Sequence, residues 1–158
     1  MIHEGYVAGL LGWCVAEHGR YYAREWGFGP FFESKVAMDM ADFVRRADQP
    51  GNHIWWAGDE TPVATLTLDG SDTRDGLVHL RWFIASAAAR GQGFGHAMMT
   101  RALDAARSDG AGGIYLTTFA GLDAARHLYE AHGFGLVHEA EDTTWGTPVR
   151  EQLFEMRF

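Results

Sequence analysis

The residue types between Arg90 and His96 are suited to binding an anion. This segment reads Arg-Gly-Gln-Gly-Phe-Gly-His, with three alternating glycines at Gly91, Gly93 and Gly95. Because glycine has no side chain, successive backbone N–H groups in such a loop can approach a ligand closely. Where such a loop opens a helix, the free N–H groups and the helix dipole favour a phosphate or pyrophosphate group. The loop therefore predicts a phosphate-binding site.

Two widespread glycine motifs do not fit this loop. The dinucleotide-binding motif G-x-G-x-x-G requires glycine where the chain has His96, counting from Gly91, or Met98, counting from Gly93. The phosphate-loop motif requires a Gly-Lys pair, and the sequence contains none. A glycine-rich turn that serves only tight packing between a strand and a helix is the alternative interpretation.

Composition and charge indicate a compact protein that binds an anion locally. The 158 residues suit a single domain over residues 1–158, with 47% hydrophobic and 22% charged residues. The net charge of −8 argues against a nucleic-acid partner or an anionic membrane surface. Residues 78–107 nevertheless contain four arginines and one acidic residue, so this segment is locally positive. The glycine loop lies inside it.

The sequence also argues against several kinds of site and location. A single cysteine, Cys14, excludes an internal disulfide and a multi-cysteine metal site. The eight histidines do not follow a metal-binding H-x-x-x-H or H-x-x-E-H spacing. No apolar run approaches the ~18 residues of a membrane span, and no secretory leader is recognised. We therefore expect a cytoplasmic protein without a membrane partner or a bound metal.

Hydrophobic spacing predicts the elements that position the glycine loop. Two amphipathic helices and three strands are expected first, at residues 6–26, 30–50, 53–57, 62–68 and 77–85. A helix from the loop to about Ser108 follows. A strand, a helix and two strands then complete the chain, at residues 114–118, 123–132, 136–142 and 149–158. Residues 69–72 are expected to form a turn, and the order predicts an α/β fold with a mixed sheet.

With these elements in place, the sequence resembles the GNAT superfamily of N-acetyltransferases. Arg90-x-x-Gly93-x-Gly95 after a strand is similar to the [Q/R]-x-x-G-x-[G/A] segment that holds the pyrophosphate of acetyl-CoA in that superfamily. Residues 124–134, AARHLYEAHGF, are similar to its helix that ends in Y-x-x-x-G-F. Stretches such as Leu80-Arg81-Trp82 resemble the acetyltransferase domains fused to MarR-type regulators still more closely. Residues 1–158 contain no winged helix, so DNA binding does not carry over.

This resemblance implies a mostly antiparallel central sheet, splayed around a cofactor cleft and flanked by helices. It also implies an acetyl-CoA-dependent N-acetyltransferase that acetylates a primary amine. In many members of the superfamily an asparagine seven positions before the catalytic tyrosine contacts the cofactor arm, and this chain has Leu122 there. We therefore expect that Thr117 or Thr118 makes this contact instead, or that the contact is missing. The implied acetyl-CoA contacts are Phe83, Ile84, Ala85, Arg90, Gly91, Gln92, Gly93, Phe94, Gly95 and His96.

The resemblance assigns two catalytic roles. Tyr129 matches the general acid that protonates the departing thiolate. His79 lies four positions before Phe83, where some members carry a catalytic glutamate, and a water chain is the alternative base. By the period-two rule for strands, residues 79, 81, 83 and 85 are expected to share one face.

The expected acceptor is a small amine, such as an amino acid or a related metabolite. The Arg81 guanidinium can bind a carboxylate beside the amine. Tyr21, Tyr22 and Trp26 are expected to line an aromatic acceptor pocket. Two alternatives stay open: an acetyltransferase for protein lysines or N-termini, and a non-catalytic acyl-CoA-binding module. Pairing of the terminal strands between two copies would give a homodimer, which the sequence neither requires nor excludes.

Overall fold

Four helices and seven strands make up the fold, which a computed structural model describes for residues 1–158. The helices are α1 (Leu10–Trp26), α2 (Pro30–Arg45), α3 (Phe94–Ser108) and α4 (Asp123–Ala131). The strands are β1 (Ile2–Glu4), β2 (His53–Gly58), β3 (Pro62–Arg74), β4 (Leu77–Ala85), β5 (Gly113–Phe119), β6 (Gly135–Asp142) and β7 (Val149–Arg157). One mixed sheet holds all strands in the order β1-β2-β3-β4-β5-β7-β6. The predicted α/β class is confirmed.

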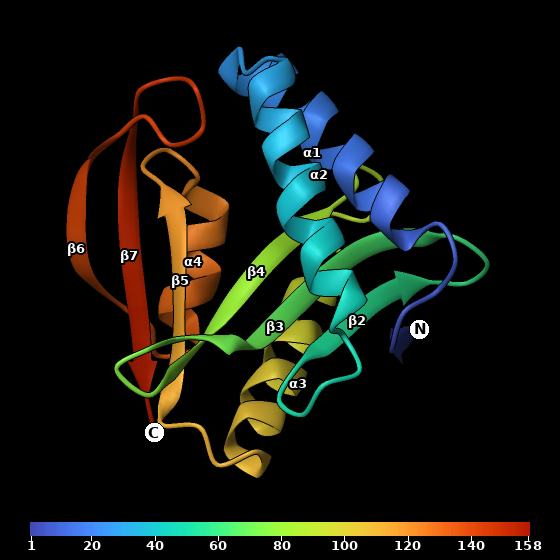
Figure 1. Ribbon diagram of the computed structural model, residues 1–158, viewed down its shortest axis with the longest axis vertical. Helices are drawn as coiled ribbons and strands as arrows, with labels where there is room; N and C mark the ends of the chain where they lie inside the picture. The colour runs from blue at the N-terminus through green and yellow to red at the C-terminus, as the bar shows by residue number, and fades with distance from the viewer.

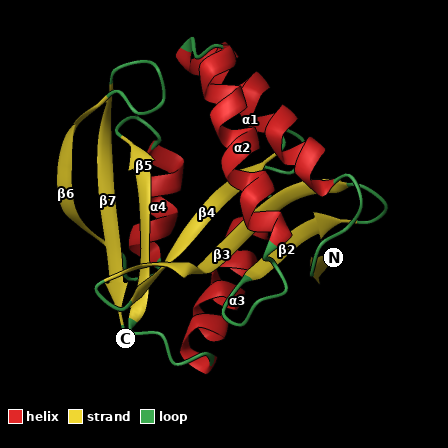
Figure 2. Ribbon diagram, in the orientation of Figure 1, coloured by secondary structure: helices red, strands yellow, loops and turns green.

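The helices cover both faces of this sheet (Figures 1 and 2). Helices α1 and α2 pack on one face, where the predicted stripe of α2 is buried, namely Phe32, Val36, Met40 and Phe43. Helix α3 packs on the other face through Met98, Met99, Ala102, Leu103 and Ala106. Two apolar cores therefore hold the sheet between helix layers.

Strands β4 and β5 separate partway along the sheet (Figure 1). They pair in parallel only at Val78–Ile114 and His79–Tyr115. Beyond His79, β4 stays paired with β3 as far as Ala85, while β5 continues beside β7. The predicted splay of the sheet is confirmed, and it leaves one edge of β4 without a strand partner.

A bulge in β4 changes which side chains share a face. The register with β3 moves from Thr67–Arg81 to Thr65–Ile84, so β4 contains one extra residue there. Trp82 takes a left-handed backbone conformation with φ 47°. Trp82 and Ile84 consequently pack with α1 and α2, whereas Phe83 and Ala85 pack on the α3 side. The prediction of one face for residues 79, 81, 83 and 85 is wrong, because the bulge reverses the alternation after Arg81.

Strand β3 is longer than predicted. The sequence predicts a turn at residues 69–72, but β3 continues to Arg74, and the turn falls at Asp75 and Gly76. The carboxylate of Asp69 accepts the backbone N–H groups of Ser71 and Asp72, which gives this stretch a turn-like local geometry. Pairing with β4 nevertheless resumes after a register shift, so the stretch is an irregularity inside a strand.

Strand β6 forms one edge of the sheet and pairs only with β7. The side chains of Leu136 and Val137 are exposed on it. Pairing of two copies along a sheet edge stays a prediction. No helix in residues 1–158 combines the length and the apolar composition needed to cross a membrane.

His53 connects three elements at the other end of the sheet. Its Nδ1 lies 3.0 Å from Glu4 of β1, and its Nε2 lies 2.8 Å from Asp109, which follows α3. Burial acts to lower the pKa of His53, but the hydrogen bonds and charges of Glu4 and Asp109 outweigh it and raise that pKa. Because the folded pKa is raised, protonated His53 stabilises the fold. This stabilisation is complete at a pH below the pKa of histidine in the unfolded chain, about 6.5, and is lost as the pH rises through the pKa of His53 in the folded protein.

We therefore expect His53→Gln to lower the Tm by about 2–4 °C at pH 6 and by much less at pH 9. Thermal unfolding of the wild type and the variant across this pH range measures the difference. A Tm difference that stays constant from pH 6 to pH 9 would contradict the protonation of His53 in the folded state.

Candidate active site

A cavity of about 710 Å³ lies in the cleft between β4 and β5. Its wall draws on α1, α2, β4, β5, α4, the loop before α3 and the loop between β6 and β7. The predicted site residues that line it are Tyr21, Tyr22, His79, Arg81, Phe83, Ile84, Ala85, Arg90, Gly91, Gly93, Phe94, Gly95, Thr117, Thr118, Leu122 and Tyr129. Trp26, Gln92 and His96, which the sequence also predicts as site residues, do not line it.

The glycine loop places free backbone donors at the start of α3. Gly91 and Gly93 have φ of 79° and 83°, a left-handed conformation that favours glycine. The first intrahelical hydrogen bond runs from Ala97 N–H to the carbonyl of Gly93, and no side chain caps the helix. The N–H groups of residues 94–96 are therefore available to an anion.

The polar side chains around this loop have partners in the protein. The Arg90 guanidinium lies 4.9 Å from the centre of the Tyr21 ring. Gln92 Nε2 donates to the carbonyl of Ala88 at 2.7 Å. His96 Nδ1 lies 3.1 Å from Nε2 of His132 at the end of α4, a pairing that the sequence did not predict. The donors that these contacts leave free at the loop are therefore backbone N–H groups and the guanidinium of Arg90, rather than the Gln92 side chain.

Strand β4 presents a free backbone edge to the cleft. Past His79 it has no partner on the β5 side, whereas its other edge pairs with β3 at Arg81, Ile84 and Ala85. An extended ligand with amide groups can hydrogen-bond to such an edge as an added strand does.

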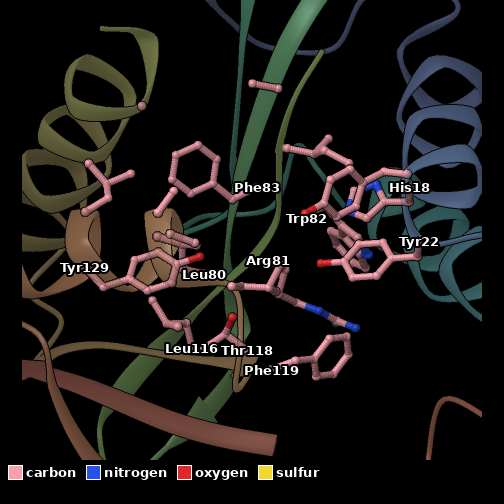
Figure 3. A pocket seen from close by; sticks show the side chains of 18 of the residues that line it. His18, Tyr22, Leu80, Arg81, Trp82, Phe83, Leu116, Thr118, Phe119 and Tyr129 are labelled. Atoms are coloured by element: carbon pink, nitrogen blue, oxygen red, sulfur yellow. The ribbon is translucent and has the colours of Figure 1, made fainter. Parts of the chain in front are cut away.

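Tyr129 reaches the cavity from α4 (Figure 3). The residue is 6% exposed, and its ring centre lies 6.4 Å from that of Phe83, 6.0 Å from Phe134 and 6.1 Å from Phe154. Burial raises the pKa of the phenol well above its usual value, and no hydrogen bond within the protein contributes. The hydroxyl therefore keeps its proton at neutral pH and can donate it to an anion in the cavity.

The end of the cavity formed by α1 and α2 is aromatic. Tyr22 packs against Phe32 and Phe119, with ring centres 4.8 and 5.8 Å apart. Trp145, from the loop between β6 and β7, lies 5.5 Å from Phe32. Trp26 packs behind this wall, 5.7 Å from Phe119. The bulge in β4 adds Trp82 to the same side as Tyr22 (Figure 3).

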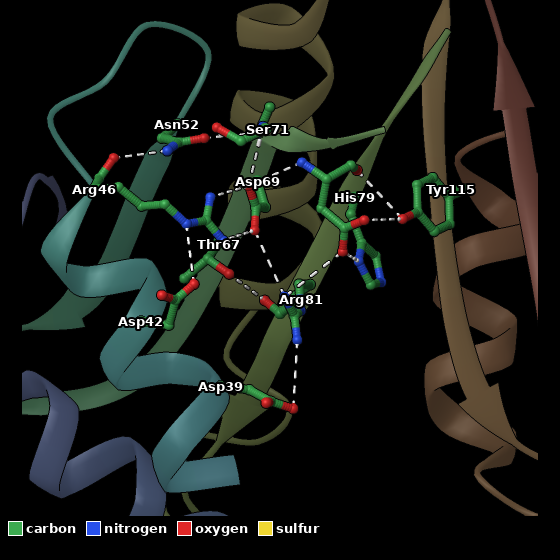
Figure 4. Close-up of polar contacts among 12 residues, drawn as sticks. Asp39, Asp42, Arg46, Asn52, Thr67, Asp69, Ser71, His79, Arg81 and Tyr115 are labelled. Atoms are coloured by element: carbon green, nitrogen blue, oxygen red, sulfur yellow. Dashed lines mark hydrogen bonds and ion pairs between the residues drawn. The ribbon is translucent and has the colours of Figure 1, made fainter. Parts of the chain in front are cut away.

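Arg81 brings a positive charge to this aromatic end. Its guanidinium lies 4.1 Å from the centre of the Trp82 ring. Its nitrogen atoms lie 3.8 Å from Asp39, 3.6 Å from Asp69 and 3.7 Å from Asp72, beyond hydrogen-bond distance (Figure 4). Since none of these carboxylates hydrogen-bonds to it, Arg81 keeps N–H donors for a ligand in the cavity.

Asp69 and Asp72 have stronger partners elsewhere (Figure 4). Asp69 is fully buried and accepts both terminal nitrogens of Arg46 at 2.7 Å. Asp72 accepts the Tyr115 hydroxyl at 3.1 Å and Nδ1–H of His79 at 2.8 Å. Burial lowers the pKa of His79 despite its bond to Asp72. His79 is therefore neutral at pH 7, with its lone pair on Nε2, as a general base requires.

Sequence reasoning missed several groups at this site. His18 of α1 lines the cavity and is 8% exposed. His18 lies four residues after the buried Cys14, a spacing that places both side chains on the inner face of α1. This spacing could have identified His18 from the sequence. No local motif predicts the cluster of Arg46, Asp69 and Asp72, because Arg46 follows α2 whereas the two aspartates lie in β3. In residues 1–158 no group of three or more potential metal ligands converges.

Comparison with known proteins links most of the chain to one family of enzymes. A family model described as the acetyltransferase (GNAT) family matches residues 12–134. N-acetylaspartate synthetase of Danio rerio is 28% identical over 144 residues, which cover 88% of this chain and 51% of that protein. The chain thus spans about half the length of this curated relative.

Solved structures share the fold. A ribosomal-protein-alanine N-acetyltransferase from Brucella melitensis aligns with a TM-score of 0.78 and 14% identity over 100% of this chain and 99% of its own. A Salmonella typhimurium structure that holds its cofactor acetyl-CoA aligns with a TM-score of 0.71 and 12% identity over 99% of this chain and 93% of its own. The mixed, splayed sheet flanked by helices is therefore a shared architecture.

Proposed function

The chain belongs to the GNAT family of acetyltransferases, and from this premise we propose that it moves an acetyl group from acetyl-CoA to the primary amine of a small acceptor that bears a carboxylate. The observation that carries the proposal is one cavity that joins the free N–H groups of the α3 loop, the phenol of Tyr129 and the available donors of Arg81. Residues 1–158 would then form one N-acetyltransferase domain. The closer likeness to domains fused to MarR-type regulators stays a prediction.

The residues around the cleft fit acetyl-CoA. The backbone of residues 91–96 and the Arg90 side chain would hold the pyrophosphate, since the N–H groups of residues 94–96 make no hydrogen bond within the protein. The free edge of β4 at residues 83–85 would pair with the amide groups of the pantetheine arm. Thr117 and Thr118 line the cavity, and the hydroxyl of one of them would bind the cofactor arm, which the apolar side chain of Leu122 cannot do. When bound, acetyl-CoA supplies a thioester carbon open to attack by an amine.

Each chemical requirement of the transfer has a candidate in the chain. The backbone N–H groups of β4 beside Phe83 would polarise the thioester carbonyl. Nε2 of His79, directly or through water, would take the proton that the acceptor ammonium must lose. Tyr129 would donate its proton to the departing sulfur and regain one from solvent.

Arg81 would select acceptors with a carboxylate near the amine. A guanidinium whose N–H groups are not hydrogen-bonded to protein carboxylates can bind an acid in a forked geometry. The name of the Danio rerio relative describes an enzyme that makes an N-acetylated amino acid, which agrees with this acceptor class.

We expect Arg81→Met to raise the KM for an amino-acid acceptor by about 10- to 100-fold, because a charged hydrogen-bond partner is removed. The Kd for acetyl-CoA, measured by calorimetry, should stay unchanged. Free-thiol release over a panel of amino acids and their decarboxylated amines measures the acceptor effect, with the decarboxylated amines as the matched control.

Three outcomes would contradict this proposal. If acetyl-CoA does not bind to the folded protein, the proposed site for the acetyl donor is wrong. Binding without thiol release for any amine would favour the non-catalytic acyl-CoA-binding module. Turnover only with lysine-containing or N-terminal peptides would favour protein acetylation.

A further inference from the structure

His18 is a buried polar residue that reaches the wall of the cavity from α1 (Figure 3). Only 8% of it is exposed, and its ring lies parallel to Tyr22 with the centres 6.3 Å apart. The neighbouring parts of the wall are apolar and include Phe32, Val36 and Trp82. None of the steps described above uses His18.

The two ring nitrogens of His18 have different roles. Nδ1 lies 2.7 Å from the backbone carbonyl of Cys14, and a carbonyl only accepts, so Nδ1 carries the hydrogen. Burial lowers the pKa of His18 to about 4, which outweighs the bond to Cys14. The ring is therefore neutral at pH 7, and its lone pair is on Nε2. Both hydrogen bonds of the ring within the protein are made at Nδ1, which leaves Nε2 as a fixed acceptor in an aromatic wall.

We propose that Nε2 of His18 accepts a hydrogen bond from the side chain of the acceptor. The acceptor is then an α-amino acid whose aromatic side chain ends in an O–H or N–H donor, such as a phenol or an indole. This inference rests on the proposed function, in which the acceptor carboxylate lies at Arg81 and its amine faces the thioester. Tyr22, Phe32 and Phe119 supply the aromatic surface for such a ring.

The charges around the cavity favour this class over an acceptor with a second carboxylate. His18 is neutral and presents a lone pair, which repels an anionic side chain. Asp39, Asp69 and Asp72 all lie within 4 Å of the Arg81 guanidinium, and their negative charges repel a second carboxylate at this end of the cavity. An apolar side chain without a donor leaves Nε2 buried and unpaired, which weakens binding.

The test compares acceptors that differ in a single group. We expect the wild type to favour L-tyrosine over L-phenylalanine by about 10- to 100-fold in kcat/KM, since a site built around a hydrogen bond rejects the analogue that lacks it. L-aspartate should be poorer than either. In His18→Phe, which keeps a ring but has no Nε2, the preference for tyrosine should fall to within about threefold. His18→Gln, whose amide oxygen can accept, should recover part of it.

Thermal unfolding and the Kd for acetyl-CoA report whether His18→Phe keeps its fold and donor site. If it does not fold, 4-methyl-L-phenylalanine replaces the variant, because it matches tyrosine in size but has no donor, and it should behave as phenylalanine does. Equal kcat/KM for tyrosine and phenylalanine, or a preference for aspartate, would overturn the inference and leave the proposed function standing. No turnover with any amine that carries a carboxylate would instead contradict the proposed function.

Discussion

Tyr129→Phe is expected to lower kcat by about 10²- to 10⁴-fold and to leave the Kd for acetyl-CoA unchanged. The substitution keeps the ring that packs against Phe83, Phe134 and Phe154 and removes only the hydroxyl. That hydroxyl makes no hydrogen bond within the protein, so its loss should leave the Tm almost unchanged. Steady-state thiol release gives kcat, and calorimetry gives the Kd.

The pH dependence sharpens this expectation. Because burial keeps the pKa of Tyr129 well above its usual value, the phenol stays protonated from pH 6 to pH 9. The ratio of wild-type to variant kcat should therefore be constant over this range. Tyr6→Phe, at an exposed tyrosine outside the cavity, is the matched control and should behave as wild type. An unchanged kcat for Tyr129→Phe, with chemistry rate-limiting, would remove Tyr129 from the role of general acid.

The parts of the site that follow local sequence rules could be predicted. Three alternating glycines identified the loop before α3. The left-handed backbone at Gly91 and Gly93 and the uncapped start of the helix are both set by residues close together in the sequence, so a local motif can predict them. The resemblance of the segment around Tyr129 to a family motif singled this residue out, and α4 brings its side chain to the cavity. Its role as general acid stays a prediction.

The parts of the site that depend on pairing between distant strands could not be predicted from the sequence. Nothing in the residues of β4 signals that Trp82, a bulky side chain, has a positive φ, since a bulge is fixed by the register with β3. The period-two rule therefore failed at Phe83. In the same way, residues 69–72 have turn-forming types. Only the pairing of Asp69 and Thr73 with β4, on either side of the register shift, makes this stretch part of a strand and brings Asp69 to Arg46 and Arg81.

Asp69→Asn is expected to lower the free energy of unfolding by about 1.5–3 kcal/mol, because it removes the charge from a buried carboxylate that accepts two hydrogen bonds from the partly buried Arg46. Asp69 is fully buried, binds Arg46 through two 2.7 Å hydrogen bonds and lies 3.6 Å from Arg81. Burial acts to raise the pKa of Asp69, but the Arg46 hydrogen bonds and charge hold it below its usual value. The stabilisation is therefore present above the unfolded pKa of about 3.9 and is lost as pH falls through the folded pKa.

Urea unfolding at pH 7 measures this loss, and two further variants separate the ion pair from a local packing effect. Asp42→Asn removes an exposed partner of the same Arg46 and should cost less than about 1 kcal/mol. Arg46→Met combined with Asp69→Asn should be more stable than the sum of the single losses predicts, because the ion pair between the two residues can be lost only once. A loss for Asp69→Asn no larger than that for Asp42→Asn would show that the pair does not stabilise the fold. Since Asp69 also lies 3.6 Å from Arg81, removal of its negative charge should lower the KM for a carboxylate-bearing acceptor, which connects the stability of this corner of the sheet to substrate binding.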